Sequence, residues 1–235
     1  MIRLHETNTA WWGSPVGLVE DARWFDQEEI ARRHDLGRFS WVEYKAALTQ
    51  SPSPFLLARA GFAFVDVQIN FRLSLSRLPQ SPSLAPLECH SAKTHPWQLN
   101  AGEMRHFEHE RFLQLPGADK ARLAERYSRW ANEVITRSPA SCVQIIFAGR
   151  VQGWFIAEPT NAGLHLALAM LAAGSTISGH HLYHRALRFY ADHGFTVGQA
   201  AFSVRNTPVM NIYAQLGARF SAPVGCWLWH SISNP

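Results

Sequence analysis

The stretch SVRNTPVMNIYAQLGARF, residues 203–220, predicts the end of a strand and a short helix, which precede a last strand at 225–229. Thr207 is a good helix cap, and Pro208 suits the first helical position because its missing N–H needs no partner there. The helix is expected to run to Leu216 and to stop at Gly217, which favours the left-handed conformation that ends helices. This strand–helix–strand unit is the reference point for the rest of the chain.

Upstream of this unit, the chain alternates between apolar runs and helical patterns, which predicts an α/β fold. Gly149-Arg150 is expected to form a hairpin turn. Residues 164–171 are apolar almost throughout, as in a strand buried on both faces. The predicted elements are strands at 142–147, 152–157, 164–171, 199–204 and 225–229, and helices at 121–135, 180–193 and 207–216.

The first third of the chain has a different character and is separated by a proline- and serine-rich stretch at 79–96, typical of a linker or an irregular crossing. Before it, the alternation of FAFVDVQINFRLSL predicts a strand over 62–75. Residues 41–48 and 55–60 are interpreted as short helices. We therefore expect a small N-terminal α/β domain over 1–80 and a main domain over 86–235.

Composition excludes several classes of protein. The chain has 235 residues, 47% of them hydrophobic, and a formal net charge of +4 with dispersed arginines, which does not favour nucleic-acid binding. No apolar run is long enough to span a membrane, and residues 1–9 lack the apolar region of a secretory signal. Three well-separated cysteines fit a reducing compartment, so a cytoplasmic protein is expected.

Twelve histidines raise the question of a metal site. The tightest groups are His106 with His109, and His180 with His181 and His184. Neither group has the HExxH arrangement, and no cysteine or carboxylate lies at ligand spacing around the second group, so no metal is expected.

The loop GSTISG at 174–179 lies between a predicted strand and a predicted helix. Free amides at a helix start point toward a ligand, and the helix dipole adds partial positive charge, so such a loop can hold a phosphate. Ser178 and Gly179 occupy the positions where the backbone would approach it. A plain connecting loop is the alternative interpretation.

Residues 203–220 and the loop before the preceding helix together resemble the GCN5-related N-acetyltransferase superfamily. The matching residues are Asn206, Tyr213 and the turn Leu216-Gly217-Ala218, with Gly179 in the position of a glycine of the family's acetyl-CoA loop. Thr176 and His181 depart from that loop's pattern. Over a longer span, from Trp11-Trp12-Gly13 to the closing CWLW, the chain is similar to the TDP-fucosamine acetyltransferases.

The resemblance implies a mixed central sheet flanked by helices, preceded by a truncated α/β domain, and acetyl-CoA as co-substrate. It assigns protonation of the leaving thiolate to Tyr213, although a core aromatic on the stripe of that helix is the alternative. The implied cofactor-binding residues are Met170, Leu171, Thr176, Ser178, Gly179, His180 and Asn206. The candidate substrate-binding residues are Trp97, Arg111, Tyr127 and Glu158.

These features predict an N-acyltransferase that acetylates an amine, with a nucleotide-linked amino sugar as the first acceptor considered. A different amine acceptor, such as an antibiotic, a polyamine or a peptide N-terminus, is an alternative. A degenerate protein that binds an acyl-CoA without turnover is another. No general base is assigned; Glu158, His109 and Glu110 are the candidates. A homodimer is left open.

Overall fold

One mixed ten-stranded sheet organises the computed structural model, which describes residues 1–104 and 110–231. Its strand order is β1-β2-β3-β10-β4-β9-β8-β7-β6-β5. The strands are β1 (Ile2–Leu4), β2 (Val16–Val19), β3 (Trp41–Ala47), β4 (Ala63–Ser74), β5 (Glu88–Ser91), β6 (Val143–Phe147), β7 (Arg150–Thr160), β8 (Gly163–Leu171), β9 (Val197–Ser203) and β10 (Arg219–His230). The α-helices are α1 (Glu6–Trp12), α2 (Glu29–Leu36), α3 (Pro54–Arg59), α4 (Lys120–Arg137), α5 (Gly179–Asp192) and α6 (Thr207–Gln215).

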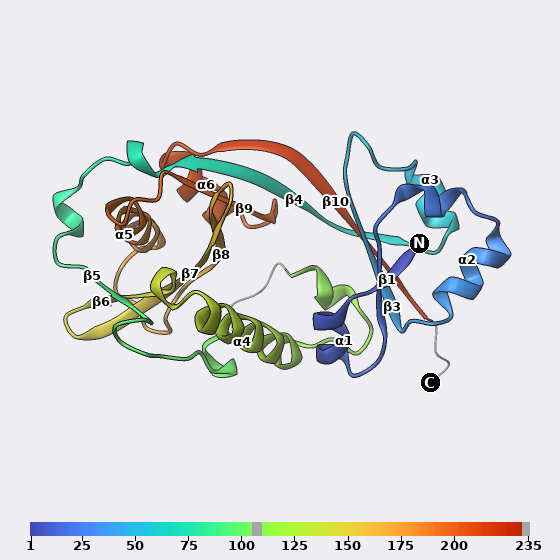
Figure 1. Ribbon diagram of the computed structural model, residues 1–235, viewed down its shortest axis with the longest axis horizontal. Coiled ribbons are helices and arrows are strands. Elements are labelled where there is room, and N and C mark those ends of the chain that lie inside the picture. Colours follow the sequence, from blue (N-terminus) through green and yellow to red (C-terminus); the bar gives the residue numbers. More distant parts are fainter. Residues whose placement is uncertain (105–109, 232–235) are drawn as a thin grey trace.

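Strands β4 and β10 connect two lobes. We call β1–β3 with α1–α3 the N-terminal lobe, and β5–β9 with α4–α6 the C-terminal lobe. The two connecting strands have 12 residues each and pair with one another in the middle of the sheet. Residues 224–230 of β10 also pair with β3, whereas residues 68–74 of β4 also pair with β9. Figure 1 shows these two long strands running side by side from one lobe to the other.

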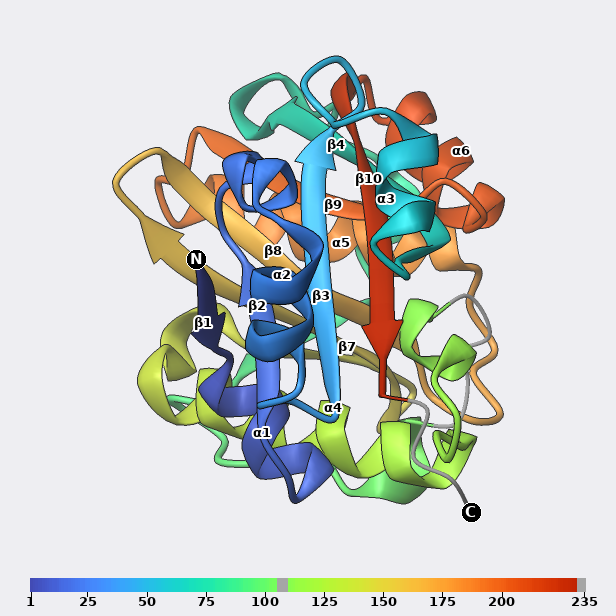
Figure 2. The same cartoon turned by 90° about the vertical axis from the view of Figure 1, so that its right-hand side faces the viewer.

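The helices cover both faces of this sheet. In the C-terminal lobe, α5 and α6 pack on one face, where Phe155, Leu187 and Tyr213 share a core. In the N-terminal lobe, α2 and α3 lie over β2, β3 and β10, as Figure 2 shows. The opposite face is covered by α4 and by the 3-10 helix η5 (Arg111–Gln114). Helix α4 reaches both lobes, because Leu123 packs beside Trp41 and Val134 packs beside Trp154.

The prediction of a helix over residues 41–48 is wrong, because this segment forms the central strand β3. Trp41 and Glu43 face η5, whereas Val42 and Tyr44 face the aromatic core under α2 and α3. All four side chains are buried. With both faces covered, the alternation of polar and apolar residues that normally marks a strand is lost.

The proline- and serine-rich stretch also differs from the prediction of a linker or irregular crossing. It contains the strand β5, which pairs with β6 and forms one edge of the sheet. The hairpin between β6 and β7 turns at Ala148 and Gly149, whose φ angles are 49° and 71°, rather than at Gly149-Arg150. Two consecutive positive φ angles are typical of a type I′ turn.

The order of elements predicted for the C-terminal lobe agrees with the structure, but the expectation that residues 164–171 are buried on both faces is wrong, because only Leu164 and Leu166 of β8 are buried. The predicted order of strands and helices between residues 142 and 230 is confirmed, as is the α/β class with a mixed sheet flanked by helices. The start of α6 is shifted, since Asn206 and not Thr207 is its N-cap, and its side chain accepts the amide of Val209. The domain boundary near residue 80 stays a prediction, because one sheet spans both segments. None of the described helices has both the length and the apolar character needed to cross a bilayer.

Candidate active site

The two parallel strands β8 and β9 separate from each other soon after they begin. They pair only at Leu164 with Gly198 and at His165 with Gln199. Beyond these pairs, β8 stays on β7 and β9 stays on β4, so the sheet opens between them. The carboxyl ends of both strands lie at the open end, which is where ligands bind in many α/β sheets.

A cleft with a volume of about 210 Å³ occupies this opening. Small side chains of the two strands line it, including Ala167 and Ala169 on β8 and Ala200 and Ala201 on β9. The cleft also reaches side chains on both faces of the sheet. Tyr183, Val209 and Tyr213 line it from the α5 and α6 face, while Glu110, Arg111 and Tyr127 line it from the α4 face. Side chains from both faces of the sheet therefore meet at one cleft.

Tyr213 lines this cleft while its ring belongs to the core. The side chain is 4% exposed, and its ring centroid lies 4.0 Å from that of Phe71 and 5.2 Å from that of Tyr183. Burial, with a contribution from Tyr183, raises the pKa of the Tyr213 phenol well above its ordinary value. The hydroxyl has no hydrogen-bond partner among the described residues. A protonated phenol in this position is suited to donate to an atom in the cleft.

Helix α5 begins just after β8 has reached the open end of the sheet. Its N-cap is Ser178, whose hydroxyl accepts the amide of His181. The amides of Gly179 and His180 are left without an intrahelical acceptor, as at every helix start. Free amides of this kind, together with the dipole of a 14-residue helix, favour an anion at this position. Gly179 also has a packing role, because an added Cβ would lie 3.0 Å from Ile212 of α6.

The loop before α5 is held by a residue that the sequence reasoning missed. Gln152 on β7 is 2% exposed, and its Oε1 accepts the Thr176 amide at 2.8 Å and the hydroxyls of Ser175 and Thr176 at 3.2 Å. One buried amide oxygen therefore orders the segment leading to the helix start. The signal in the sequence was a glutamine inside an apolar strand, next to Gly153.

Other predicted cofactor residues lie around the same opening. Asn206 lines the cleft, and its side-chain oxygen is used to cap α6. Met170 and Leu171 form the C-terminal end of β8. The Ala172 amide donates to the Gln152 carbonyl, and by the alternation of an antiparallel ladder the backbone of Leu171 points away from β7. The Leu171 amide is thus free of the β7 ladder. Burial and the nearby His184 lower the pKa of His180, which favours a neutral ring.

The α4 face of the cleft carries a buried polar network. Arg111 Nε lies 2.7 Å from Glu43 Oε1 on β3, and its Nη1 lies 3.1 Å from Glu110 Oε1. Tyr127 donates to the other oxygen of Glu110. Burial opposes ionisation of Glu43, but Arg111 outweighs it, so the pKa of the Glu43 carboxyl lies below its usual value. Beside this network, Asp66 on β4 accepts the Ser203 hydroxyl at 2.7 Å.

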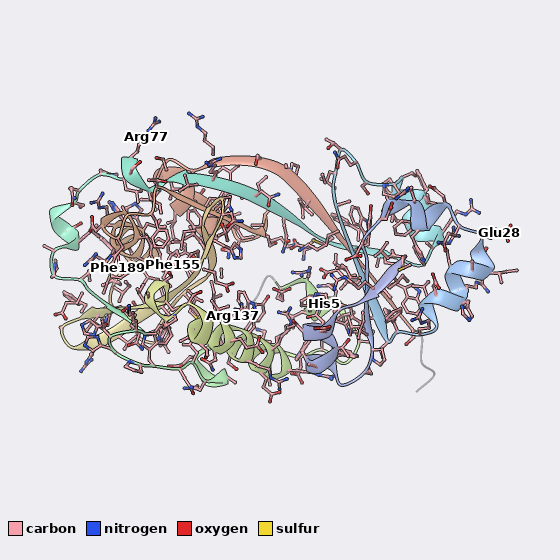
Figure 3. The ribbon with its side chains drawn as sticks, viewed as in Figure 1. His5, Glu28, Arg77, Arg137, Phe155 and Phe189 are labelled. Carbon is pink, nitrogen blue, oxygen red and sulfur yellow. The ribbon has the colours of Figure 1, made fainter. Side chains whose placement is uncertain are left out.

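The structure brings together two of the four predicted substrate residues. Arg111 and Tyr127 line the cleft. Trp97 instead packs in the core under α4, and Glu158 faces Arg137 of α4, with 2.7 Å between Arg137 Nη2 and Glu158 Oε1; Figure 3 labels Arg137. His106 and His109 lie outside the described residues. Within the described part of the chain, no group of three His, Cys, Asp or Glu residues is placed to hold a metal ion.

Comparison with known proteins places the fold. No protein-family profile matches the chain. No curated protein matches it either. Several solved structures, however, match the chain. A GCN5-related N-acetyltransferase from Sphaerobacter thermophilus has a TM-score of 0.56 at 12% identity, and the match covers 81% of this chain and 59% of that chain. The present chain therefore spans less than two thirds of that protein.

Two further structures match over more of their own length. A GCN5-related N-acetyltransferase from Kribbella flavida has a TM-score of 0.55 at 13% identity, covering 91% of this chain and 80% of that one. A tandem GNAT protein from the clavulanic acid biosynthesis pathway has a TM-score of 0.53 at 13% identity, covering 93% and 76%. The chain thus has the fold of the GCN5-related N-acetyltransferases.

Proposed function

We propose that this protein is an N-acyltransferase that binds acetyl-CoA between β8 and β9 and transfers its acetyl group to an amine. The observation that carries the proposal is the opening of the sheet after only two registered pairs, with a helix N-terminus at its open end. The opening admits an extended arm, and the helix start is suited to the pyrophosphate. The fold shared with GCN5-related N-acetyltransferases supports the same function.

The backbone would make most of the cofactor contacts in this proposal. The outward-facing amide of Leu171 would bind the pantetheine arm or the thioester carbonyl as an added strand would. The amides of Gly179 and His180 would bind the pyrophosphate. Gln152 orders this region through the Thr176 amide. Because backbone amides need no particular side chain, the departures at Thr176 and His181 do not remove these contacts.

Tyr213 would protonate the sulfur that leaves. Attack of the amine nitrogen on the thioester carbon forms a C–N bond and breaks the C–S bond. The acceptor ammonium loses one proton before the attack and a second as the amide forms. One proton goes from the Tyr213 phenol to the thiolate, the phenol is then reprotonated, and one proton is released overall. The raised pKa of Tyr213 keeps the phenol protonated at neutral pH.

A protein that binds acyl-CoA without turnover is the alternative, and one contact favours it. The Ser178 hydroxyl lies 2.8 Å from His181 Nδ1. This hydroxyl at the helix start is therefore already hydrogen-bonded within the chain and is less available to a pyrophosphate. The geometry of Tyr213 favours the enzyme, because a hydroxyl facing the cleft is of no use to binding by backbone amides.

The test is a pair of measurements on the full chain. Calorimetric titration with acetyl-CoA measures binding, and release of free CoA thiol in the presence of an amine panel measures turnover. The panel contains amino-sugar nucleotides, which the sequence resemblance suggests, together with diamines, aminoglycosides and peptides. We expect binding, and thiol release with at least one amine. Binding without thiol release on any amine supports the non-catalytic alternative, and absence of acetyl-CoA binding contradicts both.

A further inference from the structure

The end of the cleft that faces α4 is rich in carboxylates from both lobes. Asp66 comes from β4 and Glu110 from the residue before η5, and both line the cleft. Glu43 on β3 lies behind them and is 3% exposed. The cofactor features described above, the start of α5 and Tyr213, belong to the α5 and α6 side. The carboxylates therefore lie on the side from which an acceptor would enter.

One guanidinium balances two of these three carboxylates. Arg111 pairs with Glu43 at 2.7 Å and with Glu110 at 3.1 Å. Its side chain is 11% exposed, so solvent screens these pairs only weakly. The positive charge of Arg111 is thus balanced by two carboxylates, through its Nε and Nη1. The third carboxylate, Asp66, is not part of this pairing.

Asp66 is buried without a cation. It is 3% exposed, and within residues 1–104 and 110–231 no Lys, Arg or His nitrogen lies at ion-pair distance from it. Ser203 donates to its Oδ1, and no described group donates to its Oδ2. Burial of an unpaired carboxylate is unfavourable unless a positive charge reaches it. A cationic ligand that reaches Asp66 would therefore gain the free energy of pairing with this carboxylate.

We propose that the acceptor is a cationic amine, free of phosphate, and that Asp66 is the counter-ion that binds it. This inference rests on the proposed function. An ammonium group would complete the hydrogen bonds of Asp66 Oδ2 and lie beside Glu110. A nucleotide sugar would instead bring a pyrophosphate toward Asp66 and Glu110, where the charge of Arg111 is already balanced by Glu43 and Glu110. Asp66 thus selects among amines by charge, and the N-terminal segment of the chain supplies the selecting residue.

A series of amines that differ only in their distal charge tests the proposal. The acceptors are hexane-1,6-diamine, hexylamine, 6-aminohexanoate and 6-aminohexyl phosphate, each assayed by thiol release with saturating acetyl-CoA. The expected order of kcat/KM follows the positive charge, with the diamine at least 10-fold above 6-aminohexyl phosphate. Equal values, a preference for the phosphate, or no turnover of all four by a protein that binds acetyl-CoA overturns the proposal.

Three variants assign the preference to Asp66. Asp66→Asn keeps the size of the side chain and should abolish the preference for the diamine while the Kd for acetyl-CoA stays within about twofold. Ser203→Ala removes the hydroxyl but keeps the carboxylate, and should retain the order of acceptors. Glu133→Gln removes an exposed carboxylate of α4 as a control for net charge. Circular dichroism and a melting curve verify folding of each variant.

The two proposals fail in different ways. If the wild-type protein does not bind acetyl-CoA, the proposed function fails before an acceptor is involved. If it binds acetyl-CoA and Asp66→Asn keeps the wild-type order of acceptors, only the role of Asp66 is overturned. If Asp66→Asn does not fold, Asp66→Glu, which keeps the charge, should retain the diamine preference, and loss of that preference in a folded Asp66→Glu overturns the assignment.

Discussion

The parallel pairs β2/β3 and β8/β9 hold corresponding places in the two lobes and behave differently. In each lobe, an antiparallel strand precedes the pair, and a helix and a 12-residue strand follow it. The same spacing separates Trp41 from Val197 and Ala63 from Arg219, the first residues of the corresponding strands. All four residues of β2 are in register with β3, whereas β8 keeps only two pairs with β9. One pair is closed and the other is open.

The side chains explain the difference. Around the closed pair, Trp24 and Phe25 are 1% exposed and fill the space beside Tyr44. Around the open pair, the strands carry alanines, which leave room between them. The helices after the two pairs also differ at one corresponding position. Leu57 of α3 lies four residues before Gly61, and Tyr213 of α6 lies four residues before Gly217. The lobe with the closed pair therefore has an apolar residue, Leu57, at the position where the lobe with the open pair has the hydroxyl of Tyr213.

The largest expected effect comes from closing the open pair. Ala201→Trp places an indole in the cleft and should weaken acetyl-CoA binding at least about 100-fold, equivalent to about 2.8 kcal/mol. Ala214→Trp, on the exposed surface of α6, is the matched control and should bind normally. Calorimetric titration measures both. Wild-type affinity in a folded Ala201→Trp would show that the cofactor does not lie between β8 and β9.

Making the open lobe resemble the closed one at Tyr213 should affect catalysis and not binding. Tyr213→Phe keeps the ring against Phe71 and removes the hydroxyl. We expect kcat to fall about 100-fold, with the Kd for acetyl-CoA unchanged, since proton donation acts in the transition state. Steady-state kinetics and titration measure the two quantities. An unchanged kcat would assign Tyr213 to the core alone, like Leu57.

The chain enters α5 through a loop ordered by Gln152, whereas after β2 it enters the 3-10 helix η1 (Ala22–Asp26) before α2. Gln152→Leu removes the buried acceptor that binds the Thr176 amide and the hydroxyls of Ser175 and Thr176. The expected loss is about 1–3 kcal/mol in the free energy of unfolding, with acetyl-CoA affinity about 10-fold lower. Gln144→Leu on β6 is the control. Denaturant unfolding and titration test the effect, and equal losses in both variants would argue against a specific role.

The last prediction concerns thiols of the C-terminal lobe and of the connecting strand β10. Burial raises the pKa of the thiols of Cys142 and Cys226 to about 11 and that of Cys89 to about 12. A raised pKa means that the unfolded chain ionises first, so the contribution to stability is complete below pH 9 and is lost as pH rises above it. The free energy of unfolding should fall by up to about 1.4 kcal/mol per pH unit for each thiol.

Equilibrium unfolding at pH 8, 9, 10 and 11 measures this decline. Cys142→Ala removes one thiol and should make the decline less steep. Because β4 and β10 join the lobes, we expect one transition at each pH. A separate transition for each lobe would contradict the shared sheet, and a stability that rises above pH 9 would contradict the direction of the shifts.

The sequence predicts the open lobe better than the closed one. In the C-terminal lobe, helices have caps and a stripe of apolar residues, and strands show clear runs. In the N-terminal lobe, β1 and β2 have three and four residues, too few for a periodic signal. Strand β3 is buried on both faces, which hides its alternation. Short elements and double burial are therefore the physical reasons for the missed assignments.

Part of the candidate site could also be predicted. Tyr213, Asn206, Arg111 and Tyr127 were identified and line one cleft. Asp66 and Gln152 were missed, because alternation in a strand separates its faces but does not distinguish solvent from a cleft. Asp66 occupies a polar position in FAFVDVQINF, and only the opening of the sheet gives that position its surroundings. The polar residues inside strands are the ones for which tertiary structure adds most.

The connecting strands β4 and β10 also affect the order in which the two lobes can fold during synthesis. Trp227 on β10 packs in the aromatic core of the N-terminal lobe, and β4 pairs with β9. A ribosome synthesises β4 well before its partner β9, and it synthesises β10 last of the ten strands. The core of the N-terminal lobe therefore stays incomplete until β10 has been translated, and a nascent chain stopped before β10 lacks the strand that pairs with both β3 and β4.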